Sequence, residues 1–191
     1  MELLEAMQKR QSVRKFSSEM PSPEQIEAVL EAGCLAPTLF TTKDAHISII
    51  TDKDLLNDLD KAACKKFAKM LEGMGMTNTL YGAPVYILVS GKLVDEVPQG
   101  FEFLRPENIH RNVYWAMGSL MQNMQLRATE LGLSSCLINT VVVTLFDEPD
   151  LAKRVGIPKG YSPLCSMVLG KSNFGFEKRE PNKKHYQIDY I

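Results

Sequence analysis

Apolar residues recur at helical spacing in several segments of the chain, and these segments have recognisable ends. Ser22 followed by Pro23 and Gln25 is a strong helix start, with a capping serine and a capping-box partner. This helix must end before Pro37, because a residue that precedes proline is pushed out of the α region. The same pattern predicts helices at residues 2–9, 51–73, 108–131 and 149–155.

The helix predicted at residues 108–131 is the longest, and it is apolar over most of its circumference. One stripe contains Ile109, Val113, Met117, Leu120, Met124, Ala128 and Leu131. Trp115, Gly118 and Leu126 lie outside that stripe. A helix with apolar residues on most faces is buried, so we expect this one either at the centre of the molecule or between subunits.

Short apolar or β-branched runs bounded by turn residues predict strands at 46–50, 84–90, 136–138 and 163–169. The alternation of Tyr186, Ile188 and Tyr190 predicts an added strand in the tail, on this subunit or another. Helices that alternate with short buried strands indicate an α+β fold with a layered sheet. We expect a single domain over residues 1–191.

Composition narrows the choice of partner and compartment. The 191 residues carry a net charge of −1, which argues against a protein that binds nucleic acid or a polybasic membrane binder and favours a small-molecule partner. The four cysteines are too far apart to form a metal site, and we interpret them as reduced core thiols. The first residues lack the charge and apolar run of a secretory signal, so we expect a cytoplasmic protein without a membrane segment.

The sequence lacks the familiar catalytic and metal-binding motifs, and its three histidines are too far apart to suggest a metal site. Positive charge is instead concentrated near both ends of the chain, in residues 9–15 and 178–184. Each segment holds four basic residues: Lys9, Arg10, Arg14 and Lys15 in the first, and Lys178, Arg179, Lys183 and Lys184 in the second. From charge alone, the simpler interpretation is that both basic segments are solvated ends of the chain. The alternative interpretation is that they meet in the fold and form a phosphate site.

The order of several short motifs supports the phosphate site. The motifs are Arg10–Phe16 (RQSVRKF), Pro21–Glu24 (PSPE), Ala32–Pro37 (AGCLAP), Gly82–Val85 (GAPV), Leu131–Cys136 (LGLSSC), Gly156–Tyr161 (GIPKGY), Leu169–Gly170 and Lys178–Pro181 (KREP). In this order and spacing the chain resembles the FMN-dependent nitroreductase family over essentially its whole length.

The resemblance implies an α+β sheet flanked by helices in an intertwined homodimer, with FMN at the subunit interface. It assigns FMN contacts to Arg10, Gln11, Ser12 and Arg14, and later to Arg179 beside Lys178. It assigns Pro37 and Thr38 to the segment that the second subunit contributes. It places Leu137, Ile138 and Asn139 along the flavin ring. The implied activity passes hydride from NADH or NADPH through FMN to a small oxidised acceptor, such as a nitroaromatic compound or a quinone.

The loop after Pro37 departs from the family pattern. Thr41 stands where the family usually has an asparagine that touches the flavin, and Ala45 stands where it usually has tryptophan. A hydroxyl replaces only part of the hydrogen bonding of an amide. This departure motivates an alternative, a dimer that binds flavin or another phosphate-bearing ligand but has lost turnover. Because a flavin carries the chemistry itself, the lack of catalytic side chains fits the enzyme equally well.

Overall fold

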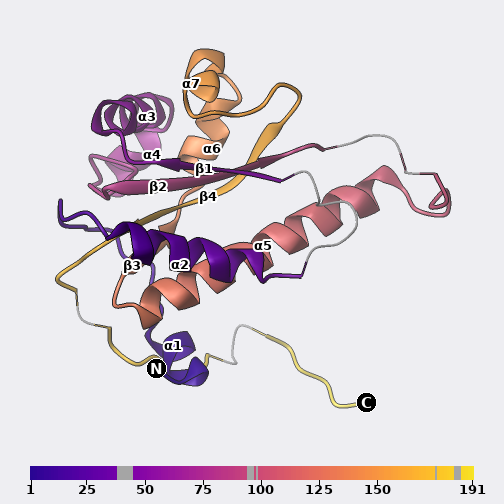
Figure 1. Ribbon diagram of the computed structural model, residues 1–191, viewed down its shortest axis with the longest axis horizontal. Coiled ribbons are helices and arrows are strands. Elements are labelled where there is room, and N and C mark those ends of the chain that lie inside the picture. Colours follow the sequence, from indigo (N-terminus) through magenta and orange to yellow (C-terminus); the bar gives the residue numbers. More distant parts are fainter. Residues whose placement is uncertain (38–44, 94–96, 98, 175, 183–185) are drawn as a thin grey trace.

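The computed structural model describes residues 1–37, 45–93, 97, 99–174, 176–182 and 186–191. The helices are α1 (Leu3–Lys9), α2 (Pro23–Cys34), α3 (Lys53–Lys66), α4 (Ala68–Gly73), α5 (Pro106–Glu130), α6 (Thr140–Leu145) and α7 (Pro149–Arg154). The strands are β1 (His46–Ile50), β2 (Val85–Gly91), β3 (Ser134–Leu137) and β4 (Ser162–Gly170). Figure 1 shows their arrangement.

The strands form one antiparallel sheet in the order β1-β2-β4-β3. Its register pairs Ile50 with Tyr86 and Val85 with Leu169, and β3 pairs Cys136 with Val168 at the edge. Every residue of β2 is buried, which agrees with the continuous apolar run in its sequence. The α+β class predicted from the sequence is therefore confirmed.

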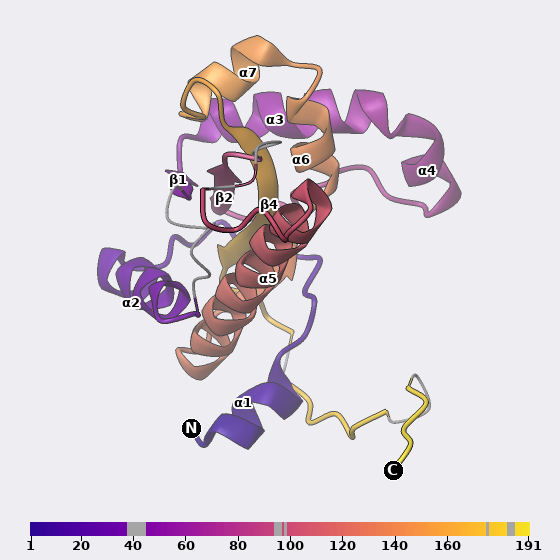
Figure 2. The same ribbon diagram turned by 90° about the vertical axis from the view of Figure 1, so that its right-hand side faces the viewer.

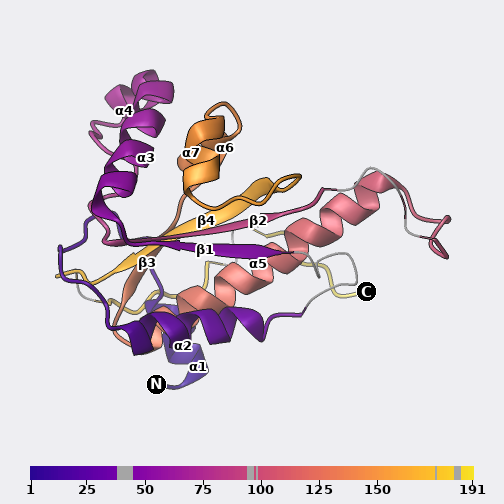
Figure 3. The same cartoon turned by 45° about the horizontal axis from the view of Figure 1, so that its top comes forward.

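Helices cover both faces of the sheet, as Figures 1 and 2 show. On one face α2 and α5 pack over the side chains of Val85, Ile87 and Met167. On the other face α3, α6 and α7 enclose Tyr86 and Leu88. The sheet thus separates two apolar cores. α1 contacts α5. Figure 3 shows α2 and α5 side by side on one side of the sheet, with α3, α4, α6 and α7 on the other.

The predicted capping box at the start of α2 is confirmed. The Gln25 backbone N–H donates to Ser22 Oγ at 3.2 Å, and the Ser22 backbone N–H donates to Gln25 Oε1 at 3.0 Å. The predicted helices and the four internal strands all form, with shifts of a few residues at their ends. The predicted helix at 51–73 is interrupted at Phe67, where the backbone leaves the helical region and divides it into α3 and α4.

One helix was not predicted from the sequence, and one predicted strand is not seen in the described residues. Residues 140–145 form a helix, although their β-branched side chains favour a strand, because Val141 and Val142 are buried against the core next to α3. The described tail residues 186–191 form no strand in the single chain. Among the described residues, no helix is long and apolar enough to cross a membrane.

Helices α5 and α1 both have apolar side chains that are exposed in the single chain. On α5 the predicted stripe is buried, but Trp115 is 65% exposed and Tyr114 is 51% exposed. On α1 the predicted apolar face is exposed too, since Leu3 and Leu4 are both more than 60% exposed. The four cysteines are unpaired as expected, but the core-thiol interpretation is wrong for Cys34, which is exposed at the end of α2.

Candidate functional site

Backbone hydrogen bonds bring the two ends of the chain together beside α1. The Arg179 backbone N–H donates to the Gln8 carbonyl at 3.1 Å, and Gln11 Nε2 donates to the Glu177 carbonyl at 3.2 Å. Farther along, Ser172 Oγ donates to the Lys15 carbonyl at 2.8 Å. Segment 8–17 therefore runs beside residues 171–174 and 176–179. The described part of the second basic segment, residues 178–182, thus meets the first; Lys183 and Lys184 lie outside the described residues.

Arg179 also fixes the end of α1. Its guanidinium donates from Nε to the Gln8 carbonyl at 3.3 Å and from Nη2 to the Met7 carbonyl at 3.2 Å. These carbonyls belong to the last turn of the helix, where cations are favourable. An arginine side chain has five N–H donors, so most of the Arg179 fork is left for a ligand.

Guanidinium groups lie near one another at this junction, and no carboxylate of the described residues is paired with them. Burial lowers the pKa of Arg10 from its ordinary value, and the nearby charge of Arg179 lowers it further. Arg10, Arg14 and Arg179 form no ion pair with any residue that the structure describes. We call Arg10, Ser12, Arg14 and Arg179 the basic cluster; its donor set suits a phosphate group, which needs charge and several N–H or O–H donors.

Strand β3 runs beside the basic cluster. Ser12 forms a parallel bridge with Ser135, and the Val13 N–H donates to the Ser135 carbonyl at 3.1 Å. Burial raises the pKa of the next residue, Cys136, while the Arg14 charge, a hydrogen bond with the Ser12 side chain and the Arg10 charge oppose the rise. The Cys136 thiol therefore lies among the members of the cluster and is neutral near pH 7.

The end of β3 continues from the cluster to the surface. Leu137 and Asn139 are exposed, whereas Ile138 is buried between them. The Ile138 N–H donates to the Ser166 carbonyl at 2.9 Å, and Ser166 Oγ donates to the Ile138 carbonyl at 2.5 Å. The segment assigned to the flavin ring is thus held to β4 by both backbone groups of Ile138.

Two of the remaining predicted site residues, Lys178 and Pro37, have other described neighbours. Lys178 lies near Glu5. A hydrogen bond and the charge of Lys9 are the main causes that lower the pKa of the Glu5 carboxyl, and the charge of Lys178 lowers it further. Pro37 lines a different hollow of about 750 Å³, with Tyr114 and Trp115 of α5. Thr38 and Thr41 lie outside the described residues.

Two residues near the cluster were not recognised from the sequence as parts of a site. Cys136 was interpreted only as a core thiol, although it stands inside a family motif. Tyr81, next to Gly82, interacts with Arg14 and lies near Cys136. The sequence feature that could have indicated a role for Tyr81 is its position directly before the Gly82–Val85 motif.

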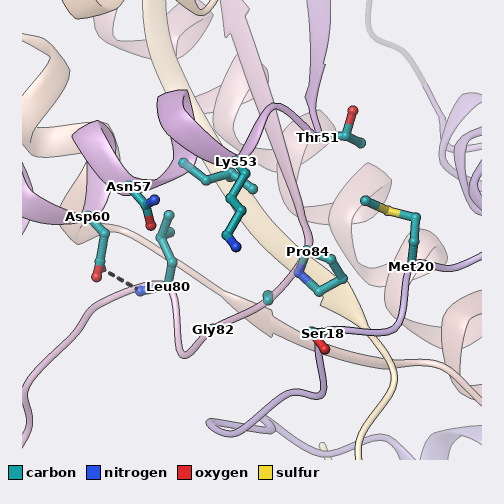
Figure 4. A pocket seen from close by; sticks show the side chains of 11 residues that line it. Ser18, Met20, Thr51, Lys53, Asn57, Asp60, Leu80, Gly82 and Pro84 are labelled. Carbon is teal, nitrogen blue, oxygen red and sulfur yellow. Dashed lines mark hydrogen bonds between the residues drawn. The ribbon is translucent and has the colours of Figure 1, made fainter.

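A separate cavity of about 330 Å³ lies at the turn that contains Gly82. Figure 4 shows Lys53 and Asn57 of α3 on one side of it and Ser18 and Pro84 on the other. None of the residues that line this cavity belongs to the basic cluster. Among the described residues, no group of three or more His, Cys, Asp or Glu side chains is placed to hold a metal ion.

Comparisons with known proteins agree with this geometry. The chain has 25% identity and a TM-score of 0.80 to a nitroreductase with bound FMN from Desulfitobacterium hafniense, over 100% of this chain and 99% of that one. A nitroreductase with bound FMN from Bacteroides fragilis has 23% identity and a TM-score of 0.76, over 100% of both chains.

A third similar structure, from Parabacteroides distasonis, bears the name NADH dehydrogenase/NAD(P)H nitroreductase. It has 19% identity and a TM-score of 0.66, over 99% of this chain and 98% of that one. A comparison with curated proteins gave no match. The family model described as Nitroreductase family matches residues 7–171. The chain therefore belongs to the nitroreductase family.

Proposed function

We propose that the protein is an FMN-dependent oxidoreductase that transfers hydride from NADH or NADPH to a small oxidised acceptor of the nitroaromatic or quinone type. The observation that carries the proposal is the basic cluster, in which three guanidinium groups and a hydroxyl lie together and the guanidinium groups form no ion pair with any described residue. Family membership and the FMN named in two similar structures favour a flavin nucleotide as the anion.

In this proposal Arg10, Ser12, Arg14 and Arg179 hold the FMN phosphate. Gln11, which is anchored to the Glu177 carbonyl, keeps the backbone of the first basic segment in place. The exposed end of β3 at Leu137–Asn139 lies along the flavin ring, and Ser166 keeps its backbone fixed. Bound FMN would supply the two-electron chemistry, and the protein would supply position and electrostatics.

We further propose that the working form is a homodimer. Tyr114 and Trp115 on α5 and Leu35 after α2 expose apolar surface, and Leu35 is 83% exposed. Surface of this kind marks an interaction site. In the dimer the partner chain would supply Pro37 and Thr38 to the flavin, which accounts for the distance of Pro37 from the cluster within one chain. Thr41 lies in the loop after Pro37 and would be part of the same segment that the partner chain supplies to the flavin.

The name of the similar protein from Parabacteroides distasonis supports a nicotinamide donor, NADH or NADPH. The experiment is to load the purified protein with FMN and to add either donor without air. Loss of the yellow flavin absorption, with its return on adding a quinone, is the expected result. Protein that cannot be loaded with FMN would refute the proposal.

The altered loop favours a second candidate, a dimer that binds flavin without turnover. Thr41 and Ala45 replace residues with which the family usually contacts the flavin or fills the space beside it. The same experiment separates the candidates, because a non-catalytic binder would take up FMN and keep its yellow colour in the presence of both donors.

A further inference from the structure

The turn that carries Tyr81 has an unusual backbone. Tyr81 has a φ of +58° and Gly82 a φ of +73°, and the Ala83 N–H donates to the Leu80 carbonyl at 3.0 Å. Positive φ at both central residues is the pattern of a type I′ turn, whose first central position usually holds Asn, Asp or Gly. A bulky tyrosine at this position is strained.

Several hydrogen bonds hold Tyr81 in this conformation. Its N–H donates to Asn78 Oδ1 at 2.9 Å, and its carbonyl accepts from the Phe16 N–H at 3.2 Å. Asp60 Oδ1 accepts from the Leu80 N–H at 3.0 Å, the bond drawn in Figure 4. Strained residues that their surroundings hold so firmly occur preferentially at functional sites.

The Tyr81 side chain reaches the basic cluster. The Phe16 bond keeps segment 14–16 next to the turn, and the Arg14 guanidinium lies near the half-buried phenol. Burial raises the pKa of Tyr81, the proximity of Cys136 adds to this, and the nearby Arg14 guanidinium opposes it. The phenol is therefore neutral near pH 7, and its oxygen can accept a hydrogen bond from the guanidinium.

Arg14 needs such a partner more than the other arginines of the cluster. It is exposed, whereas Arg10 is partly buried and Arg179 is tied to the end of α1. A long exposed side chain loses much conformational entropy when it binds a ligand, and it loses less when it is already held in the binding geometry.

We propose that Tyr81 is a positioning residue of the phosphate site, which holds the Arg14 guanidinium toward the phosphate of a flavin nucleotide. This rests on the proposed function, because it assumes that FMN is the ligand of the basic cluster. The strain at the turn is then the cost of placing an aromatic hydroxyl where the usual turn residues, Asn or Gly, would end short of Arg14.

The test compares the FMN dissociation constants of the wild type, Tyr81→Phe, Arg14→Ala and the double variant, measured by quenching of flavin fluorescence. Phenylalanine keeps the ring and removes only the hydroxyl. Tyr81→Phe should weaken FMN binding about fivefold, the usual effect of one lost hydrogen bond. In the Arg14→Ala background the same change should have no further effect, since the two residues act as one unit.

Tyr161→Phe is the matched control, because Tyr161 is also half-buried but lies against Lys92, and none of its described contacts involves the cluster. It should leave FMN affinity unchanged. An unchanged dissociation constant in Tyr81→Phe, or equal losses with and without Arg14, would overturn the inference while the proposed function stands. Wild-type protein that binds no FMN would instead overturn the proposed function, and this inference with it.

Discussion

The basic cluster and the outer face of α5 differ in how completely a single chain builds them. In the basic cluster, Arg179 is fixed by three hydrogen bonds to the last turn of α1, and Ser12 is fixed beside β3. On the outer face of α5, Tyr114 and Trp115 are exposed around a hollow of about 750 Å³. The residues of the basic cluster are held by hydrogen bonds within the chain, whereas the outer face of α5 presents apolar surface to solvent.

This difference separates two requirements for binding a flavin nucleotide. A phosphate is recognised by charge and hydrogen bonds, which the single chain already supplies at the basic cluster. A flavin ring needs apolar cover on its faces, and in the proposed site the exposed end of β3 would supply one side only. The comparison therefore predicts that phosphate binding and subunit association can be weakened independently.

Trp115→Ser should have the largest effect, because a large aromatic residue at the centre of an interface often contributes about 2 kcal/mol or more to association. The parent should scatter light as two chains of 21.4 kDa and the variant as one. Phe146→Ser is the control, since Phe146 is similarly exposed but follows α6 on the other side of the sheet. A parent protein that is monomeric would contradict the proposed dimer.

Arg10→Ala and Arg179→Ala should each weaken FMN binding by about 1.5–3 kcal/mol, the range for hydrogen bonds to charged groups. Flavin titration measures this, with Arg154→Ala as the control. Arg154 is an exposed arginine on α7 whose partner is Asp58 at 2.8 Å. The dimer should persist in both cluster variants. Wild-type FMN affinity in both of them would show that the phosphate lies elsewhere.

Ser22→Ala should lower the free energy of unfolding by about 1 kcal/mol through loss of the α2 cap. Thermal unfolding measures the change, and FMN affinity at the basic cluster should stay at the parent value because the side chain of Ser22 caps α2 through Gln25 and is not part of the cluster. Ser18→Ala, an exposed serine before the helix, should leave stability unchanged. An equal loss in both variants would mean that the cap is not the cause.

The elements with strong local signals could be predicted from the sequence. Ser22 with Gln25 fixed the start of α2, and the continuous apolar run fixed β2. α6 could not be predicted, because Val141 and Val142 favour a strand locally and only their burial in the core makes a helix the better choice. Local periodicity also could not tell that Leu3 and Leu4 would be exposed in one chain.

The candidate site could also be predicted only in part, because its geometry depends on contacts between segments that are far apart in the sequence. The two basic segments were visible as charge, but their meeting depends on backbone hydrogen bonds such as Arg179 to Gln8, which no local pattern reveals. Tyr81 was not predicted at all, because its positive φ is imposed by Asn78 and Phe16 against its own preference. Met117, predicted for the apolar stripe, is buried in the chain's own core, so an exposed residue such as Trp115 is the better test of the interface.

The smallest expected effect concerns pH and the Cys136 thiol inside the basic cluster. Burial raises the pKa of this thiol above its ordinary value of 9.0, so near pH 7 it places no negative charge beside the phosphate. As the pH rises above that value, ionisation begins and the thiolate repels the phosphate. FMN affinity, titrated from neutral pH into the alkaline range, should therefore fall more steeply in the parent than in Cys136→Ala once the thiol ionises, above pH 9.0.

Cys165→Ala is the matched control for this titration. Burial raises the pKa of Cys165 to about 12, and this residue lies on β4, packed against the core that faces α5. Its removal should leave the pH dependence of FMN affinity as in the parent. If Cys136→Ala follows the parent at every pH, the thiol does not face the phosphate.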